Sequence, residues 1–343
     1  MVDRQPLDTR ALASYLVRHI PLRTEALELI RVGQGYSNPT FALRSNDQDL
    51  PYILRSQPQG PLPKSAHAID REFRVMGALA SSEVPVPQMI HYCADASIIG
   101  TPFYIMERVS GRVFTDNALP GVSGDDRTAM YQAMADTLAK LHSVDIDAAG
   151  LRDFGKAGDY FTRQLLTWSR QHDALRLPES QDADRLLGWL QEGRPAARDE
   201  TVIIHGDYKL SNLMFHTTQP RVVAVLDWEL STLGDPMADL GYNLLTWLQR
   251  PDELNGLGGV DLRADGIPEM REYASWYLTK RGLPLDVDPF FIAFACFKVA
   301  VIFEGVVRRE AQGVGTGTTA QHSSAYYAQA FARHGLDIAG LQS

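Results

Sequence analysis

One short segment of the chain, residues 205–212, reads His-Gly-Asp-Tyr-Lys-Leu-Ser-Asn and follows an apolar run directly. A further acid, Asp227, stands at the end of the next apolar run, in Val-Leu-Asp-Trp-Glu. Phosphoryl transfer from a nucleotide bound with Mg²⁺ needs an acid that orients and deprotonates the acceptor hydroxyl, and oxygen ligands that hold the metal. We therefore predict Asp207 as the catalytic base and Asn212 and Asp227 as metal ligands. Lys209 is a candidate cation for the transferred phosphoryl group.

These residue types have other uses, because Asp and Asn favour turns and Asp caps helices. The His-Gly pair before Asp207 and the Leu-Asp-Trp-Glu run around Asp227 make the combination specific, and it favours phosphoryl transfer. His205 is interpreted as a residue that ties the loop through its ring. Asp239 is expected either to cap the following helix or to brace the catalytic loop by accepting backbone N–H groups.

A glycine-containing loop, Gly33-Gln34-Gly35-Tyr36-Ser37-Asn38, lies between two predicted strands. Small residues in such a loop let backbone N–H groups close over phosphates, which makes Gly33, Gly35, Ser37 and Asn38 candidate nucleotide contacts. The loop lacks a third glycine, and two glycines in a hairpin are often only a turn. The chain has no Gly-Lys-Ser/Thr loop of the Walker type, which disfavours a P-loop fold.

A cation and a carboxylate follow this loop. Arg55 ends a predicted strand, and Glu72 lies on the helix predicted next. Such a pair can hold the α- and β-phosphates of a nucleotide, although an ordinary surface ion pair is the alternative.

Periodicity and turn signals predict the elements that position these residues. Strands are expected over 27–32, 40–44, 52–55 and 103–106, and helices over 8–19 and 66–80. From residue 125 onward the pattern turns helical, with helices expected over 160–172, 182–190, 239–248, 269–280, 290–309 and 323–334. Two short strands, 202–204 and 222–226, bracket the catalytic segment. We therefore predict an α+β fold of two lobes: a nucleotide-binding lobe with a small antiparallel sheet over 1–108, and a helical lobe over 109–343 with the catalytic loop and acceptor site.

Composition limits the classes of partner. The chain has 343 residues, 33 Lys and Arg against 42 Asp and Glu, and a net charge of −9, which argues against nucleic-acid binding. Cys93 and Cys296 lack metal-ligand spacing and are expected to be reduced, buried thiols. The N-terminus does not read as a signal peptide, and the apolar run 289–303 is interrupted by Lys298, so we expect a buried helix, no membrane partner and a cytoplasmic location.

Together these motifs resemble the aminoglycoside phosphotransferase family, the small-molecule branch of the protein-kinase-like fold, from about residue 29 to about 305. The resemblance implies the two-lobe kinase-like fold, ATP and Mg²⁺ as cofactors, and Asp207 as the catalytic aspartate, with Asn212 and Asp227 as magnesium ligands. It also implies that Glu72 partners the phosphate-binding cation, and Arg55 stands where many members carry lysine, which replaces a point charge by a planar fork. Residues 104–109 resemble the strand and joint whose backbone meets the adenine, with Glu107 and Val109 as the contacts.

A closer similarity is to the kinase-like domain that is fused to acyl-CoA dehydrogenases in animals. Segments 35–41, 52–55 and 100–108 carry it. This similarity implies a metabolic hydroxyl acceptor, such as a hydroxy acid or a hydroxyacyl thioester. We expect the acceptor wall in the helical lobe, where arginines would suit an acidic acceptor; the candidates are Tyr160, Arg163, Gln164, Trp168, Arg308 and Arg309.

The sequence thus predicts an ATP- and Mg²⁺-dependent phosphotransferase that moves the γ-phosphoryl group to a hydroxyl of a small molecule. One alternative is a nucleotide-binding module without turnover that acts through partners. Arg55, at the position where many family members carry lysine, is compatible with this alternative. Another is a kinase of the aminoglycoside or choline type. A protein kinase is disfavoured, because the segment after Asp227 is short and has no Ala-Pro-Glu signature.

Overall fold

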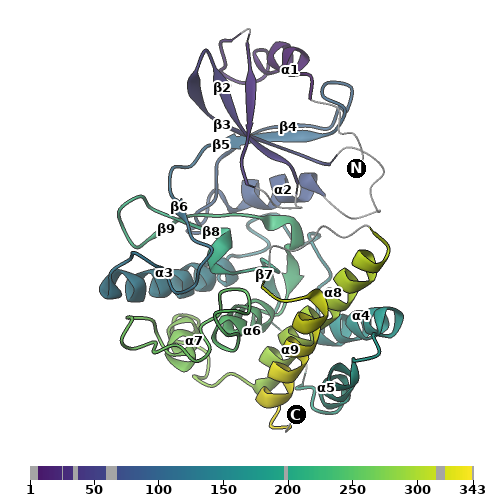
Figure 1. Ribbon diagram of the computed structural model, residues 1–343. Helices are drawn as coiled ribbons and strands as arrows, with labels where there is room; N and C mark the ends of the chain where they lie inside the picture. The colour runs from purple at the N-terminus through teal and green to yellow at the C-terminus, as the bar shows by residue number, and fades with distance from the viewer. Residues whose placement is uncertain are drawn as a thin grey trace. The chain divides into compact units, whose positions relative to one another are not determined.

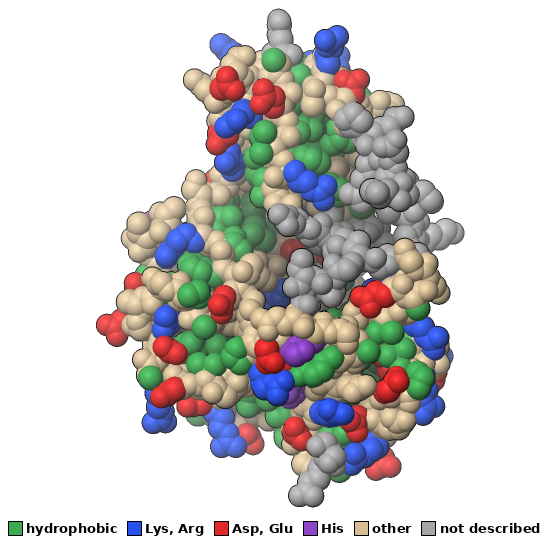
Figure 2. Space-filling model, in the orientation of Figure 1, with side chains coloured by type: hydrophobic (Ala, Val, Ile, Leu, Met, Phe, Trp, Pro, Cys, Tyr) green, Lys and Arg blue, Asp and Glu red, His purple; other side chains and the backbone are tan. Residues whose placement is uncertain are grey.

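The computed structural model describes residues 7–24, 26–33, 38–58, 68–196, 200–313 and 321–341. The chain forms two compact units: Met1–Gly111 with Val223–Ser231, and Arg112–Val222 with Thr232–Ser343. We predicted one boundary, after residue 108. In the structure, Val223–Ser231, the segment with Asp227, also belongs to the first unit. Over the face drawn in Figure 2, cationic and anionic side chains are scattered among one another.

The first unit is built on a five-stranded sheet with the order β1-β2-β3-β5-β4 (Figure 1). Its strands are β1 Glu28–Arg31, β2 Thr40–Ser45, β3 Gln48–Ser56, β4 Met89–Cys93 and β5 Phe103–Glu107, and all neighbours pair antiparallel. The β2–β3 turn has positive φ at Asn46 and Asp47, a conformation that Asn and Asp tolerate better than most residues. Strands β2 and β3 overlap the strands predicted over 40–44 and 52–55, whereas strand β4 was not predicted.

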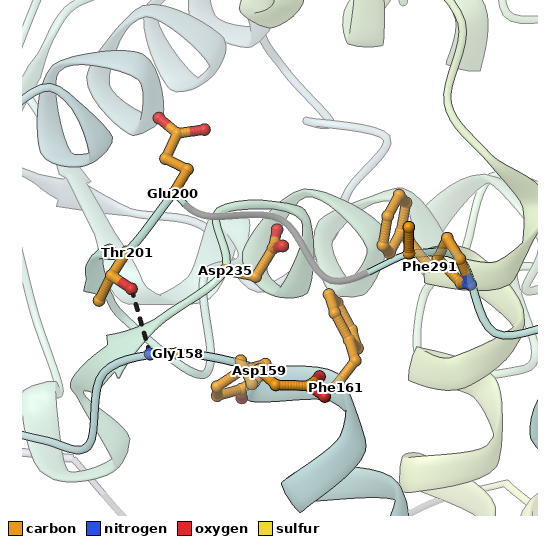
Figure 3. Close-up of a pocket in the computed structure, with 10 residues that line it drawn as sticks. Gly158, Asp159, Phe161, Glu200, Thr201, Asp235 and Phe291 are labelled. Carbon is orange, nitrogen blue, oxygen red and sulfur yellow. Dashed lines mark hydrogen bonds between the residues drawn. The ribbon is translucent and has the colours of Figure 1, made fainter.

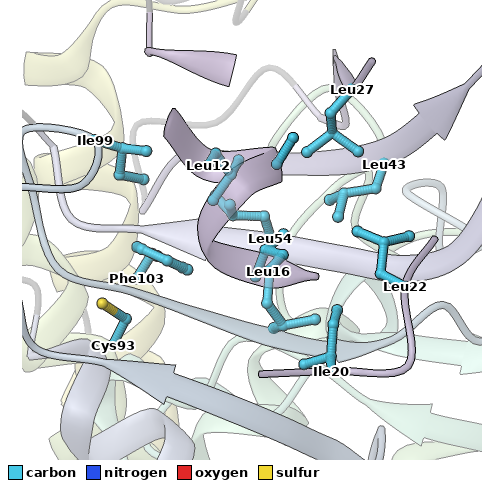
Figure 4. Packing of buried hydrophobic residues seen from close by; sticks show 12 residues of the cluster. Leu12, Leu16, Ile20, Leu22, Leu27, Leu43, Leu54, Cys93, Ile99 and Phe103 are labelled. Carbon is cyan, nitrogen blue, oxygen red and sulfur yellow. The ribbon is translucent and has the colours of Figure 1, made fainter. Parts of the chain in front are cut away.

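Helix α1, Thr9–Leu16, covers one face of this sheet. Asp8 caps the helix by accepting from the backbone N–H groups of Arg10 and Ala11 at 3.0 and 2.9 Å. Leu12 and Leu16 then lie in one fully buried cluster with strand residues such as Leu43, Leu54 and Phe103 (Figure 4). Burying each of these side chains stabilises the unit by roughly 1.5–3 kcal/mol.

Helix α2, Ile69–Leu79, contacts β4, β5 and the short helix η2, Trp228–Leu230. Its buried stripe consists of Ile69, Glu72, Val75, Met76 and Leu79. The spacing puts a carboxylate among apolar side chains, and a buried carboxylate needs charged or hydrogen-bonding partners. Glu72 therefore marks a polar site inside the first unit.

The second unit is mainly helical (Figure 1). Its α-helices are α3 Gly124–His142, α4 Tyr160–Leu175, α5 Gln181–Glu192, α6 Met237–Leu244, α7 Met270–Lys280, α8 Pro289–Ala311 and α9 Ser324–Ile338. Short strands interrupt them: β6 Arg112–Val113, β7 Val202–Ile204, β8 Leu213–Phe215 and β10 Thr232–Gly234, with β6 antiparallel to β8 and β7 antiparallel to β10. The 3₁₀ turns η1 Leu210–Asn212 and η3 Leu245–Trp247 complete this unit, and the boundary between the units falls within β9, Val222–Val225.

Helix α8 is long and apolar enough to cross a membrane by length and composition. However, 72% of its apolar 18-residue stretch is buried inside the protein. It contacts α4, α5, α6 and α9. A core helix of a soluble protein passes the same test, so this helix alone is weak support for a membrane span. Cys93 and Cys296, the latter on α8, are free and buried, as expected.

Candidate active site

The catalytic segment follows β7 and turns sharply at Gly206, which has φ +83°, a conformation that favours glycine. Asp239 on α6 holds this turn. Its Oδ2 accepts from the backbone N–H of His205 at 2.6 Å, and its Oδ1 accepts from the N–H of Gly206 at 2.8 Å. The Nδ1 atom of His205 accepts from the N–H of Asp207 at 3.2 Å. The bracing roles predicted for His205 and Asp239 are confirmed.

The Asp207 carboxylate is held on both oxygens. Its Oδ1 accepts from the hydroxyl of Tyr242 at 2.6 Å, and its Oδ2 lies 2.9 Å from both Nζ of Lys209 and Nδ2 of Asn212. Burial opposes ionisation of Asp207, but Lys209, Tyr242 and His205 outweigh it, and the pKa of the carboxyl is lowered. Asp207 is therefore an oriented, charged carboxylate at neutral pH.

Asn212 closes the same loop. Its Nδ2 donates both to the backbone oxygen and to Oδ2 of Asp207, at 2.8 and 2.9 Å. Because both bonds use the amide nitrogen, the amide oxygen is the end of this side chain that is left for a cation. The η1 turn, Leu210–Asn212, fixes this orientation.

A cavity of about 380 Å³ adjoins Lys209 and Tyr242. Among the described residues that line it, Lys209 is the charged one and none is a carboxylate. Its apolar wall comes from η3, the following loop, α8 and α9: Leu245, Leu254, Val299, Ile302, Phe303 and Phe331. A second cavity, lined by Asp235, Glu200 and Phe291 among others, measures about 20 Å³, room for roughly a water molecule (Figure 3). Of the two, only the larger can hold an acceptor.

None of the six residues predicted for the acceptor wall lines the larger cavity. Arg163 donates to the backbone oxygens of Lys156 and Ala157 at 2.7 and 3.1 Å. Arg308 donates to those of Leu175 and Arg176 at 3.2 and 2.6 Å. These arginines hold loops and a helix end because unpaired carbonyl groups there attract cations.

In the first unit, Arg55 lies between two carboxylates. Its Nε is 2.8 Å from Oε2 of Glu72, and its Nη2 donates to Oδ1 of Asp227 at 2.6 Å. Glu72 also accepts from the hydroxyl of Tyr104 at 3.0 Å and from the amide of Asn38. Burial raises the pKa of Glu72, and these three partners oppose the shift. The expected Arg55–Glu72 pair thus forms, and it is a buried network rather than a surface ion pair.

Asp227 has left-handed backbone angles, φ 65° and ψ 60°, immediately before η2. This conformation is uncommon for a residue with a Cβ atom and persists where the surroundings enforce it. The next residue, Trp228, is fully buried, and its indole N–H donates to the backbone oxygen of Val225 at 2.9 Å. Oδ2 of Asp227 has no protein partner within the described ranges.

Some of the other predicted nucleotide contacts lie within the described residues and some lie outside them. Gly33 has φ +78°, and Asn38 contacts Glu72, while Gly35 and Ser37 lie outside the described residues. The backbone N–H of Glu107 donates to Gln88 O at 2.9 Å. The backbone N–H and C=O of Val109 make no backbone hydrogen bond within the described part of the chain.

Two tyrosines of the site were missed from the sequence. Tyr242 lies three residues after Asp239 on α6, a spacing that places both on one helix face, and this signal was available. Tyr104 lies on the buried strand β5, and nothing in its local sequence marks it as a partner of Glu72.

Comparisons with known proteins support the kinase-like assignment. Residues 28–276 match the family model described as "phosphotransferase enzyme family". Acyl-CoA dehydrogenase family member 10 of Mus musculus is 44% identical over 303 residues, which cover 88% of this chain and 28% of that protein. The chain spans 28% to 43% of the length of the acyl-CoA dehydrogenase relatives in this group.

Two solved structures share the fold. A Ralstonia eutropha JMP134 protein, described as a candidate aminoglycoside phosphotransferase, is 41% identical with a TM-score of 0.87, covering 98% of this chain and 99% of that one. An aminoglycoside phosphotransferase in a ternary complex with AMP-PNP and hygromycin B is 14% identical with a TM-score of 0.63, covering 96% of this chain and 98% of that one. With an antiparallel five-stranded sheet followed by a mostly helical part, this chain has the kinase-like fold, and it belongs to the phosphotransferase enzyme family.

Proposed function

We propose that the protein is an ATP- and Mg²⁺-dependent phosphotransferase that moves the γ-phosphoryl group to a hydroxyl of a small molecule. The observation that carries the proposal is the Asp207 carboxylate, which Tyr242 and Lys209 hold beside a cavity of about 380 Å³. An acceptor hydroxyl in that cavity would donate its hydrogen bond to Asp207, which then takes the proton as the new O–P bond forms. Lys209 would offset charge on the transferred phosphoryl group.

The residues present fit a hard cation with oxygen ligands. The amide oxygen of Asn212 and the free carboxylate oxygen of Asp227 are of the type that Mg²⁺ prefers. Within the described ranges no three His, Cys, Asp or Glu side chains gather as a metal site. Phosphate and water oxygens would therefore complete the coordination, which is usual for Mg²⁺. When bound, the ion neutralises charge on the nucleotide phosphates.

Nucleotide binding is assigned to the first unit. Arg55 supplies a permanently charged, planar group for the phosphates, and Glu72 and Asp227 hold it in one orientation. The backbone groups of Val109 would meet the base. The AMP-PNP complex of the aminoglycoside phosphotransferase with this fold is an example in which the fold holds an adenine nucleotide.

The acceptor cavity supports a hydroxy acid or hydroxyacyl thioester. Its wall on α8 and α9 is apolar, which suits a hydrocarbon chain, and Lys209 would attract an anionic or carbonyl oxygen. A polycationic aminoglycoside would find no carboxylate among the described residues that line this cavity. The names of the acyl-CoA dehydrogenase relatives point to the same class of molecule.

The test is an acceptor screen that follows ADP release with Mg²⁺ and ATP. It includes hydroxyacyl thioesters, free hydroxy acids, choline and an aminoglycoside. We expect turnover with a hydroxyacyl compound and a loss of at least about 100-fold in Asp207→Asn. Asp145→Asn, in an exposed turn of the same unit, is the matched control and should retain activity. Equal rates for wild type and Asp207→Asn would exclude catalysis at this site, and ATP binding without any turnover would favour the non-catalytic module.

A further inference from the structure

Lys298 is the one charged residue of the apolar run 289–303 in α8. Its ammonium group donates to the backbone oxygen of Gly206 at 3.2 Å. It also lies 5.3 Å from the ring centre of Tyr242 on α6 and 6.0 Å from that of Trp168 on α4. Burial lowers the pKa of Lys298, an effect that Asp239 and Asp207 oppose. A carbonyl oxygen and two aromatic faces thus surround an amine that is costly to bury.

The carbonyl that Lys298 contacts belongs to the peptide group joining Gly206 to Asp207. The same peptide group is held at its other end, because the N–H of Asp207 donates to Nδ1 of His205. The preceding N–H, of Gly206, donates to Asp239. The orientation of the Gly206–Asp207 peptide determines the direction in which the Asp207 side chain leaves the backbone. Lys298 therefore holds the side of the turn that Asp239 does not reach.

Helix α8 also forms part of the acceptor cavity. Ile302, which lines the cavity, lies one helical turn after Lys298 on the same side of α8. Any shift of this helix relative to the catalytic turn would therefore change the spacing between the acceptor wall and Asp207. A direct bond from α8 to Gly206 fixes that spacing.

We propose that Lys298 is a positioning residue for phosphoryl transfer, which fixes the Gly206 carbonyl and so aligns Asp207 with the acceptor wall on α8. This inference rests on the proposed function. A methionine of similar length would fill the same space without the cost of burying an amine, so we infer that the ammonium group is needed as a hydrogen-bond donor. Its acceptor is the backbone oxygen of Gly206, in the catalytic turn.

The experiment compares Lys298→Met and Lys298→Arg with the matched control Arg127→Met. Arg127 on α3 is also mostly buried and donates to backbone oxygens, those of Leu119 and Asp265, away from the catalytic turn. Steady-state kinetics with the best acceptor give kcat and both KM values. Hydrogen–deuterium exchange of the peptide covering residues 203–210 reports on the turn without requiring activity.

For Lys298→Met we expect kcat to fall by about 10- to 100-fold, as misalignment of a catalytic group does, with KM for ATP and for acceptor within about twofold of wild type. Exchange in residues 203–210 should be faster in this variant and unchanged in Arg127→Met. Lys298→Arg, which keeps charge and donors, should recover part of both properties.

Several results would overturn the inference. In Lys298→Met these are an unchanged hydrogen–deuterium exchange rate in residues 203–210, an unchanged kcat, or a change confined to the KM of the acceptor. Equal effects of Lys298→Met and Arg127→Met would also overturn it. If Lys298→Met yields no folded protein, Lys298→Gln and Lys298→Arg are compared by the same two measurements. A wild type that transfers phosphate to no acceptor would refute the proposed function, whereas the exchange comparison would still decide whether Lys298 holds the turn.

Discussion

The hydroxyl of Tyr242 donates to Oδ1 of Asp207 at 2.6 Å. Asp239, one turn earlier on α6, accepts the backbone N–H groups of the two residues before Asp207. One helix thus holds both the backbone and the side chain of the catalytic segment. The other carboxylate oxygen is shared by Lys209 and Asn212, so the orientation of the carboxylate is fixed from two directions.

Removing the tyrosine hydroxyl should impair chemistry more than binding. We expect Tyr242→Phe to lower kcat by about 10-fold or more, because a hydrogen bond to a charged group is worth roughly 1.5–3 kcal/mol. The KM for ATP should stay near its wild-type value. Tyr273→Phe is the control, since the buried Tyr273 hydroxyl has no hydrogen-bond partner in the described structure. A Tyr242→Phe enzyme with wild-type kcat would show that the contact does not orient the base.

Arg55 should not be replaceable by lysine without loss. A guanidinium group reaches Glu72 and Asp227 together, whereas a single ammonium group lacks this fork. We expect Arg55→Lys to weaken ATP binding by about 10-fold, measured by titration calorimetry, and Arg55→Met to weaken it further. Arg44→Lys on β2, whose partner Asp49 is exposed, serves as control and should bind normally. Equal affinity of wild type and Arg55→Lys would contradict a phosphate-binding role that depends on geometry.

Asp239→Asn should destabilise the second unit. The buried carboxylate accepts two backbone N–H groups and lies 3.2 Å from Nε2 of His142, while an amide would present N–H groups to one of these donors. We expect the free energy of unfolding to fall by about 2–4 kcal/mol in urea titrations. Asp288→Asn, at the N-cap of α8, should cost under about 1 kcal/mol. If both variants lost a similar free energy of unfolding, Asp239 would contribute no more than an ordinary helix cap.

The buried His172 predicts a pH dependence of stability. Its Nδ1 lies 2.8 Å from Glu304 on α8, and its Nε2 lies 3.0 Å from Asp184 on α5. Burial alone would lower the pKa of His172, but the two carboxylates outweigh it, and the pKa is raised above 6.5. A raised folded-state pKa means that this group stabilises the fold below pH 6.5 and that the stabilisation is lost as pH rises through the folded-state pKa.

The difference in Tm between wild type and His172→Gln should therefore shrink as the pH rises from 6 toward 8.5, at constant ionic strength. Thermal unfolding followed by fluorescence measures this. A difference that stays constant or grows with pH would mean that His172 is neutral in the folded protein.

Local features and the Arg55–Glu72 pair were predictable from the sequence, and the other long-range partners were not. The Asp207–Asn212 loop, the cap at Asp8 and the turn after β2 depend on residues within a few positions of one another. The bond between Arg55 and Asp227 joins residues 172 positions apart, and only the fold brings them together. Strand β4, with the sequence Met-Ile-His-Tyr-Cys, lacks the alternation by which a half-buried strand is recognised.

The acceptor side illustrates the same limit. Lys298 interrupted an apolar run, a feature from which we inferred only burial, and its contact with Gly206 depends on the packing of α8. Arg163 and Arg308 suggested an anionic acceptor by residue type, yet both bind backbone oxygens. Residue type gave the class of chemistry, whereas tertiary packing determined which cation is near the catalytic turn.

The membership of Val223–Ser231 in the first unit has a consequence for dissection of the molecule. Three hydrogen bonds hold this segment in the first unit: Val225 N–H to Pro85 O, Arg71 to Ser231 O, and Arg55 to the Asp227 carboxylate. A fragment ending at Gly111 would lose the acid that faces Arg55 and the indole beside α2. No single cut in the gene releases the complete first unit, so chimaeras between relatives must exchange two separate stretches of sequence together.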